Sequence, residues 1–183
     1  MSDRADARYR QVTAWKHARA VLLLPCMNTV LIPAGLIAYF ADAGSMALSS
    51  VALIAMPVAV VLLAAGLTLV IRSISLFVTR GDGTLAPWDP TRKLVTVDIY
   101  RYSRNPMKLG LFLILIGECL LLESLALCVW ASVFVVANVG YIRWFEEPGL
   151  RQRFGQSYDD YCRSVSRWLG RAAQPVEPSV ELR

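Results

Sequence analysis

Long stretches without a charged side chain alternate with short basic stretches along the chain. The first, residues 20–41, contains 22 residues, and the second, residues 43–71, contains 29. About 20 apolar residues are needed to cross roughly 30 Å of hydrocarbon, so both stretches are long enough to span a bilayer. Because a chain in lipid must satisfy its own backbone hydrogen bonds, we predict that both are helices.

A third apolar region covers residues 109–142, and only Glu118 and Glu123 carry charge within its 34 residues. One helix of that length would extend about 51 Å, which is far more than a single crossing needs. We therefore predict a helical hairpin that turns near Glu123 and Ser124, with a short first arm at 109–122. Pro148 disfavours helix at Glu147, so the last transmembrane helix is expected to end there. The pattern predicts an all-α membrane protein with about four transmembrane helices, the last two forming the hairpin.

The basic residues lie in three groups that alternate with these spans. Of the 19 Lys and Arg residues, five lie at 4–19, seven at 72–108 and seven at 143–183. Lys and Arg in short loops mark the cytoplasmic side of a membrane. Four crossings with both termini in the cytoplasm put every group on that side, next to anionic lipid headgroups. The net charge of +5 thus indicates a membrane-facing surface. It gives little support to nucleic-acid binding, because no part of the chain resembles a soluble recognition fold.

Four regions follow from this pattern. Residues 1–19 form a cytoplasmic segment, and residues 20–71 form the first two helices. Residues 72–171 combine a cytoplasmic loop, the hairpin at 109–147 and C-terminal amphipathic helices. Residues 172–183 are expected to be a disordered tail. The loop at 72–108 has 37 residues and is apolar enough to be ordered at the membrane surface, and loops of that length are often functional. The short N-terminal half suggests a bacterial inner-membrane protein.

Beyond Pro148, apolar residues recur in steps of four and three, which is typical of one face of a helix. They are Leu150, Phe154, Tyr158, Tyr161, Val165 and Trp168. Gly155 weakens the helix at its middle, so two short helices are possible. The residues opposite this face are Arg151, Arg153, Arg163 and Arg167. Either the face lies in the membrane interface, or it packs on the cytoplasmic loop.

A metal centre is not expected. His17 is the only histidine, and none of the four cysteines has metal-ligand spacing relative to another. This composition excludes a multi-histidine site and leaves little room for a Ser-His triad.

Two polar clusters flank the hairpin on the cytoplasmic side. Arg104-Asn105 precedes its first arm, and Glu146-Glu147 follows its second. Because the hairpin brings its two ends together, the clusters should face each other. The patch is suited to a zwitterion, although basic residues with a neutralising ion pair would have the same pattern. Glu118 lies within the short arm; it either has a functional role, as intramembrane carboxylates often do, or lies near the far interface.

These clusters resemble motifs of the isoprenylcysteine carboxyl methyltransferase and phospholipid methyltransferase superfamily. That superfamily shows G-x-Y-R-x-x-R-[HN]-P-x-Y-x-G, a hydrophobic hairpin, and then E-E-x-x-L-x-x-x-F-G-x-x-Y-x-x-Y. The matching positions in this chain are Tyr100, Arg101, Arg104, Asn105, Pro106, Gly110, Glu146, Glu147, Leu150, Phe154, Gly155, Tyr158 and Tyr161. The resemblance covers about half of the chain.

The resemblance implies methyl transfer from S-adenosylmethionine to a lipophilic acceptor that enters from the lipid side. It implies that the cofactor-binding residues are Leu94, Tyr100, Arg104, Asn105, Gly110, Glu146 and Glu147. Among them, Arg104 and Glu147 are the catalytic candidates. Gly110 would let its helix approach the ligand closely. Acceptor-binding candidates are Arg163 and Arg167 for a carboxylate, and Glu118 for a headgroup. An amine acceptor would instead need a glutamate as base.

The chain departs from the motif at two positions. The glycine before the tyrosine is replaced near Asp98, and the tyrosine after R-N-P-x is Lys108. The second change removes an aromatic wall and adds a cation, which bears on the acceptor more than on the cofactor. Two other functions remain open, a non-catalytic membrane partner or sensor with the same fold, and a small transporter that uses Glu118.

Overall fold

A computed structural model of the protein describes residues 22–40, 50–80 and 93–170, and these residues contain helices and no strand. The predicted cytoplasmic segment at 1–19 and the predicted disordered tail at 172–183 lie outside the described residues. So does the turn-rich part of the loop, at 81–92.

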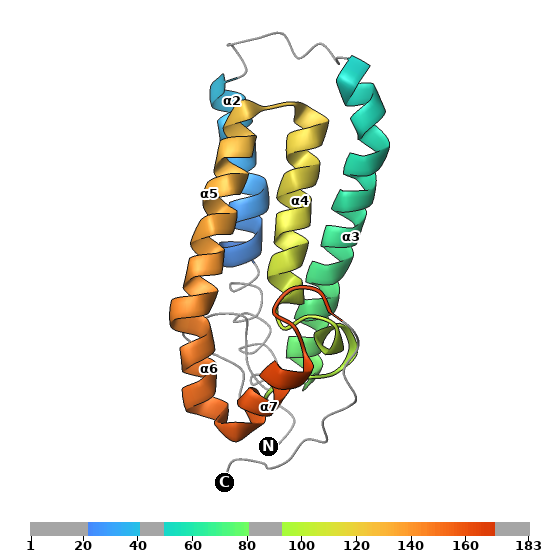
Figure 1. Ribbon diagram of the computed structural model, residues 1–183. Coiled ribbons are helices and arrows are strands. Elements are labelled where there is room, and N and C mark those ends of the chain that lie inside the picture. Colours follow the sequence, from blue (N-terminus) through green and yellow to red (C-terminus); the bar gives the residue numbers. More distant parts are fainter. Residues whose placement is uncertain (1–21, 41–49, 81–92, 171–183) are drawn as a thin grey trace, which may run out of the picture.

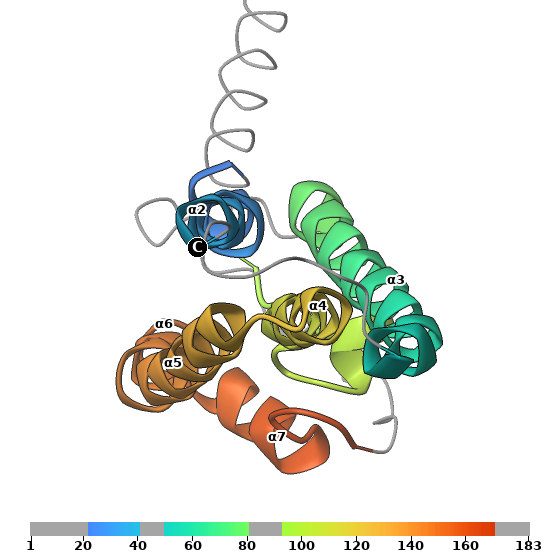
Figure 2. The same ribbon diagram turned by 90° about the horizontal axis from the view of Figure 1, so that it is seen from above.

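Four long helical segments lie side by side (Figure 1). The first combines the π-helix η1 (Leu22–Leu31) with α2 (Ile32–Phe40), and the second is α3 (Ser50–Arg80). The hairpin consists of α4 (Pro106–Leu122) and α5 (Leu125–Tyr141). Seen from above, α4 lies between α3 and α5 (Figure 2) and packs against both. The shorter elements are η3 (Asp98–Arg101), η4 (Ile142–Glu146), α6 (Glu147–Phe154) and α7 (Gln156–Ser164).

The outward surface of the long helices is apolar. Helical segments Ile54–Arg80 and Leu125–Phe154, with 27 and 30 residues, are long and apolar enough to cross a membrane. Ile54 is 79% exposed and Val136 is 71% exposed. Water would disfavour such contiguous apolar surface, whereas lipid accommodates it. The fold is therefore that of an all-α membrane protein, as the sequence predicts.

The predicted end of the second helix is wrong. The charge at Arg72 suggested that a loop begins there, but α3 continues to Arg80. Residues beyond Arg72 still pack against the rest of the protein. Ser73 is fully buried, and the ring centres of Phe77 and Tyr100 lie 5.6 Å apart. The Arg72 side chain is 55% exposed, so a single charge on the outer face does not end the helix.

The predicted break at Glu147 is also wrong. Helix α5 continues through the π-helical turn η4 into α6, and it ends only at Phe154. Pro148 lies inside this continuous helix, directly after the π-helical turn. The π-helical turn places Glu146 and Glu147 at the junction of two helical registers, and such turns are frequent at functional sites.

The hairpin turn lies where the sequence predicts it. Helix α4 is capped by Glu123 in the left-handed conformation, and Ser124 begins α5 by accepting the Leu127 N–H at 3.4 Å. The two short helices that the sequence allowed are present, since Gly155 separates α6 from α7 with φ of +54°.

The aromatic face of the C-terminal helices packs on the protein. Tyr158, Tyr161 and Val165 form a buried cluster against the partly buried Leu94 and Leu150. Of the two alternatives left open for this face, the structure contains packing on the loop that precedes α4, through Leu94. This packing brings α7 back toward the start of α4.

Candidate functional site

The chain after α7 closes one end of the helical bundle. The Arg104 N–H donates to the Ser166 carbonyl at 3.0 Å, and the Gly170 N–H donates to the Tyr102 carbonyl at 3.1 Å. These backbone bonds attach the C-terminal segment directly to the residues that precede α4. Side chains on α4, α6 and this segment are therefore held at one place.

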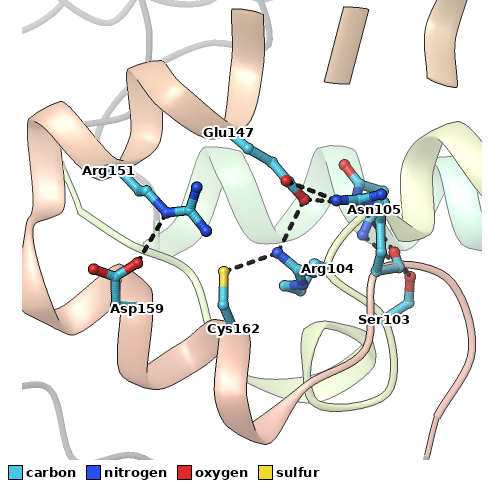
Figure 3. A network of polar contacts seen from close by, with 8 residues as sticks. Ser103, Arg104, Asn105, Glu147, Arg151, Asp159 and Cys162 are labelled. Carbon is cyan, nitrogen blue, oxygen red and sulfur yellow. Dashed lines mark hydrogen bonds and ion pairs between the residues drawn. The ribbon is translucent and has the colours of Figure 1, made fainter. Parts of the chain in front are cut away.

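A buried ion network lies at this place (Figure 3). Glu147 accepts hydrogen bonds from Arg104 Nη1 at 3.0 Å and from Arg167 Nε and Nη2 at 2.8 Å each. The Glu147 side chain is 8% exposed and that of Arg104 is 12% exposed. The two bonds from Arg167 form a planar fork on the carboxylate, which is a strong and orientation-specific pairing. Asn105 Nδ2 donates to the Arg167 carbonyl at 3.2 Å and supports this position.

The network contains two guanidinium groups and one carboxylate. Arg104 Nε is buried and has no hydrogen-bond partner among the described residues. A buried cation without full compensation is costly. An anion or another hydrogen-bond acceptor beside Arg104 Nε would therefore be bound favourably.

A second ion pair joins α4 to η4. Lys108 Nζ contacts Glu146 Oε2 and lies 4.9 Å from the centre of the Tyr141 ring. The Lys108 side chain is 14% exposed and that of Glu146 is 34% exposed. The two adjacent carboxylates of the motif thus have different partners, since Glu147 binds arginines and Glu146 binds a lysine.

A cavity of about 750 Å³ extends from these ion pairs along α4 and α5. Its volume is in the range of cavities that hold cofactors and small ligands. Charged residues line one end, and mainly apolar residues of α5 line the rest. The lining includes Pro25, Asn28, Leu94, Tyr100, Arg104, Asn105, Lys108, Leu111, Trp130, Val133, Phe134, Ala137, Asn138, Tyr141, Glu146, Glu147, Arg153, Phe154, Tyr158 and Tyr161.

Tyrosines on η3 and α7 form a rigid wall. The Tyr161 hydroxyl donates to the Tyr100 carbonyl at 2.7 Å, and the two side chains are 3% and 6% exposed. Burial raises the pKa of the Tyr161 phenol well above its usual range. The phenol therefore stays neutral at physiological pH and remains a hydrogen-bond donor.

Most of the predicted cofactor residues line this one cavity. They are Leu94, Tyr100, Arg104, Asn105, Glu146 and Glu147. They come from the loop, η3, the start of α4, η4 and α6. The expectation that Arg104-Asn105 faces Glu146-Glu147 is confirmed by the Arg104–Glu147 contact.

Gly110 has a different place from the predicted one. It faces α3, where a Cβ at this position would lie 2.7 Å from the Gly66 carbonyl oxygen, and it is not part of the cavity lining. Its lack of a side chain lets α4 approach α3 closely. It does not bring α4 closer to the cavity.

The three predicted acceptor-binding residues do not lie together. Glu118 lies in α4, away from the cavity lining, and one of its carboxylate oxygens is buried without a partner among the described residues. Arg163 is 74% exposed and pairs with Asp160 on the surface of α7. Arg167 does reach the site, but it binds Glu147 and is not opposite the packed face.

Sequence reasoning missed several residues of the site. Cys162 Sγ accepts from Arg104 Nη1 at 2.8 Å, and nothing in its spacing indicates this role. Trp130 and Asn138 line the cavity from α5. A polar Asn138 in an otherwise apolar helix is a signal that could have been followed.

Comparison with known proteins agrees with this geometry. The chain matches the phospholipid methyltransferase family over residues 54–157. It belongs to that family. The matched segment contains the hairpin and both ion-paired glutamates, while Arg167 lies beyond it. No curated protein and no solved structure matches the chain. Membership of the family makes the chain a membrane methyltransferase in general terms.

Among the described residues, no group of three His, Cys, Asp or Glu side chains could hold a metal ion. The charged groups of the site are instead arranged as pairs of opposite sign.

Proposed function

We propose that this protein transfers a methyl group from S-adenosylmethionine to a lipophilic acceptor at the membrane. The single observation that carries the proposal is the cavity, which joins a cluster of paired charges to a mainly apolar surface between helices. A zwitterionic cofactor suits the first part, and an acceptor with an apolar chain suits the second.

The residues fit the cofactor in chemical terms. Arg104 Nε is a buried donor with no partner in the described part of the chain, so a carboxylate of the cofactor would satisfy it. Glu146 uses Oε2 for Lys108 and keeps lone pairs for an ammonium group. Tyr141 and Phe154 line the same cavity, and aromatic faces attract cations such as a sulfonium.

When bound, the cofactor would supply an electrophilic methyl group, and the protein would supply alignment. Methyl transfer is an in-line displacement, so holding the two partners in one geometry accounts for much of the rate. Arg104 would hold one end of the cofactor and is itself held by Glu147. Because Glu147 already accepts three guanidinium hydrogen bonds, we assign it to positioning Arg104 and not to taking a proton.

Cofactor binding is the direct test. We expect the purified protein in detergent to bind S-adenosylmethionine and its demethylated product, and Arg104→Gln and Glu146→Gln to weaken this binding tenfold or more, which is about 1.4 kcal/mol. Arg143→Gln is a matched control, because it removes an exposed charge of η4 that does not line the cavity. Titration calorimetry gives the affinities, and thermal unfolding shows whether each variant is folded. A folded wild-type protein that binds neither molecule would refute the proposal.

A further inference from the structure

Two cysteines lie at matching positions on the two arms of the hairpin. Cys119 lies four residues before Glu123, which caps α4. Cys128 lies four residues after Ser124, which is the N-cap of α5. The two helices run antiparallel and pack against each other (Figure 1), and each rises about 1.5 Å per residue. The turn therefore brings the two cysteines to the same level of the hairpin.

The core contacts between α4 and α5 agree with this pairing. The ring centres of Phe112 and Phe134 lie 6.1 Å apart across the two helices. Cys119 follows Phe112 by seven residues, about two helical turns, so both lie on one face of α4. Cys119 packs against the core cluster that contains both rings. Cys128 precedes Ala131 of the same cluster by about one turn, so it lies beside the packed face of α5.

The two thiols contact each other. The side chains of Cys119 and Cys128 are hydrogen-bonded to one another, and both cysteines are free in the structure. Cys128 is exposed, whereas Cys119 is partly buried. Because a disulfide requires its two cysteines to be close together, this pair already has the proximity that a bond needs. The exposed Cys128 is the thiol that a reagent would reach first.

The pair lies at the end of the bundle opposite the ion network. The adjacent turn contains the exposed Glu123, and no Lys or Arg lies at 109–142. From the positive-inside rule we predict that this end lies outside the cytoplasm. Disulfides form and persist in oxidising compartments there, whereas the cytoplasm keeps thiols reduced.

We propose that Cys119 and Cys128 are a modification site, at which an external disulfide oxidises them to a disulfide bond that stabilises the hairpin. The Cys128 thiolate attacks one sulfur of the incoming disulfide and releases a thiolate, which leaves a mixed disulfide on Cys128. The Cys119 thiolate then attacks the Cys128 sulfur and releases the second thiolate. The incoming disulfide takes up two electrons, and the two protons lost from the cysteines end on the two released thiols.

This site is separate from the cavity, whose lining contains neither cysteine. The bond would nevertheless join α4 to α5 close to the cavity, because Trp130 lies two residues after Cys128 and belongs to the lining. A disulfide restricts the conformations that the unfolded hairpin can adopt. We therefore expect the oxidised protein to resist heat better than the reduced protein.

Mass spectrometry of one tryptic peptide tests the inference. Residues 109–143 contain Cys119 and Cys128, no other cysteine and, before Arg143, no Lys or Arg. The full-length protein in nonionic detergent is reduced, freed of reductant, treated with oxidised glutathione and blocked with N-ethylmaleimide. We expect most of this peptide to have lost two hydrogen atoms and to carry neither glutathione nor maleimide. Dithiothreitol before blocking should restore a peptide with two maleimide groups.

Single substitutions show whether the two thiols act together. Cys128→Ser and Cys119→Ala should each give a peptide with an adduct on the remaining thiol. Cys26→Ser is the control, since this residue lies in η1, and it should still form the internal bond. Oxidation should raise the midpoint of thermal unfolding of the wild-type protein by several degrees. It should not raise the midpoint of Cys128→Ser or Cys119→Ala.

Three results would overturn the inference, each obtained with reduced protein that shows a cooperative unfolding transition before oxidation. One is a wild-type peptide that carries two separate adducts after treatment with oxidised glutathione. The second is a disulfide that links the peptides of two chains instead of forming within one. The third is an internal disulfide that leaves the midpoint of unfolding unchanged, because the bond would then not stabilise the hairpin.

Discussion

At the scale of single residues, Asp98 shows how the fold tolerates a departure from the family motif. Its φ is +56°, a left-handed conformation that suits the glycine of the motif. Aspartate tolerates this conformation better than most residues do. Arg72 Nη2 also contacts Asp98 Oδ2 at 2.6 Å, which ties the turn to α3. The turn is thus retained although the glycine is absent.

Substitutions at Asp98 should separate the backbone effect from the ion pair. We expect Asp98→Ala to lower the free energy of unfolding by about 1–2 kcal/mol, because alanine is disfavoured in the left-handed region. Asp98→Asn and Asp98→Gly should cost less than about 1 kcal/mol, since they lose only an exposed ion pair. Unfolding in detergent measures all three. Equal stability of the Ala and Gly variants would contradict the role of the left-handed turn.

At the scale of helices, small residues determine how α3 and α4 pack. A Cβ at Gly66 would lie 2.6 Å from the Gly110 carbonyl oxygen, and a Cβ at Gly117 would lie 3.1 Å from the Ala59 carbonyl oxygen. The contacts are seven residues apart on each helix. Helices in lipid associate through such close backbone approach, because no hydrophobic effect drives them together. The position of Lys108 and Arg104 at the start of α4 depends on this packing.

Gly110→Ala should therefore destabilise the helix pair without touching the ligand site. We expect a midpoint of thermal unfolding several degrees lower, because the added methyl group would meet backbone atoms of α3 that cannot move aside easily. Gly35→Ala is the control, since the added methyl group would meet no other helix or side chain within 4 Å among the described residues. S-adenosylmethionine affinity per folded molecule should be unchanged in Gly110→Ala. A lower S-adenosylmethionine affinity with unchanged stability would instead indicate that Gly110 contacts the cofactor.

At the scale of the whole molecule, charge divides the two ends of the bundle. Among the described residues, the basic ones lie at the end that carries α6 and α7, and none lies in the hairpin turn at the other end. The cavity's charged part is at the basic end. From the positive-inside rule we predict that this end faces the cytoplasm.

Cysteine labelling tests this orientation. In a chain with its four native cysteines replaced, Glu123→Cys and Gln152→Cys each add one exposed thiol, one in the hairpin turn and one on α6. In intact cells, we expect a membrane-impermeant maleimide to label the Glu123→Cys chain only. Both chains should react after the cells are opened. Labelling of the Gln152→Cys chain alone in intact cells would reverse the orientation.

The sequence alone was sufficient to predict the helices, the hairpin and the pairs of residues that face each other across the hairpin. Apolar length and charge position are local properties, and lipid leaves the backbone few structures other than helix. The motif residues around Arg104 and Glu147 could be paired because a hairpin of known length brings its ends together.

The tertiary structure alone decided which partner each charge has and where two helices end. The fork between Arg167 and Glu147 requires the chain to reverse at Gly155 and pack its tyrosines on Leu94, and helical periodicity placed Arg167 on the opposite face. The continuation of α3 beyond Arg72 likewise depends on packing of residues distant in sequence. Neither the charge at Arg72 nor Pro148 ends its helix, so these boundaries and ion pairs are properties of the folded protein as a whole.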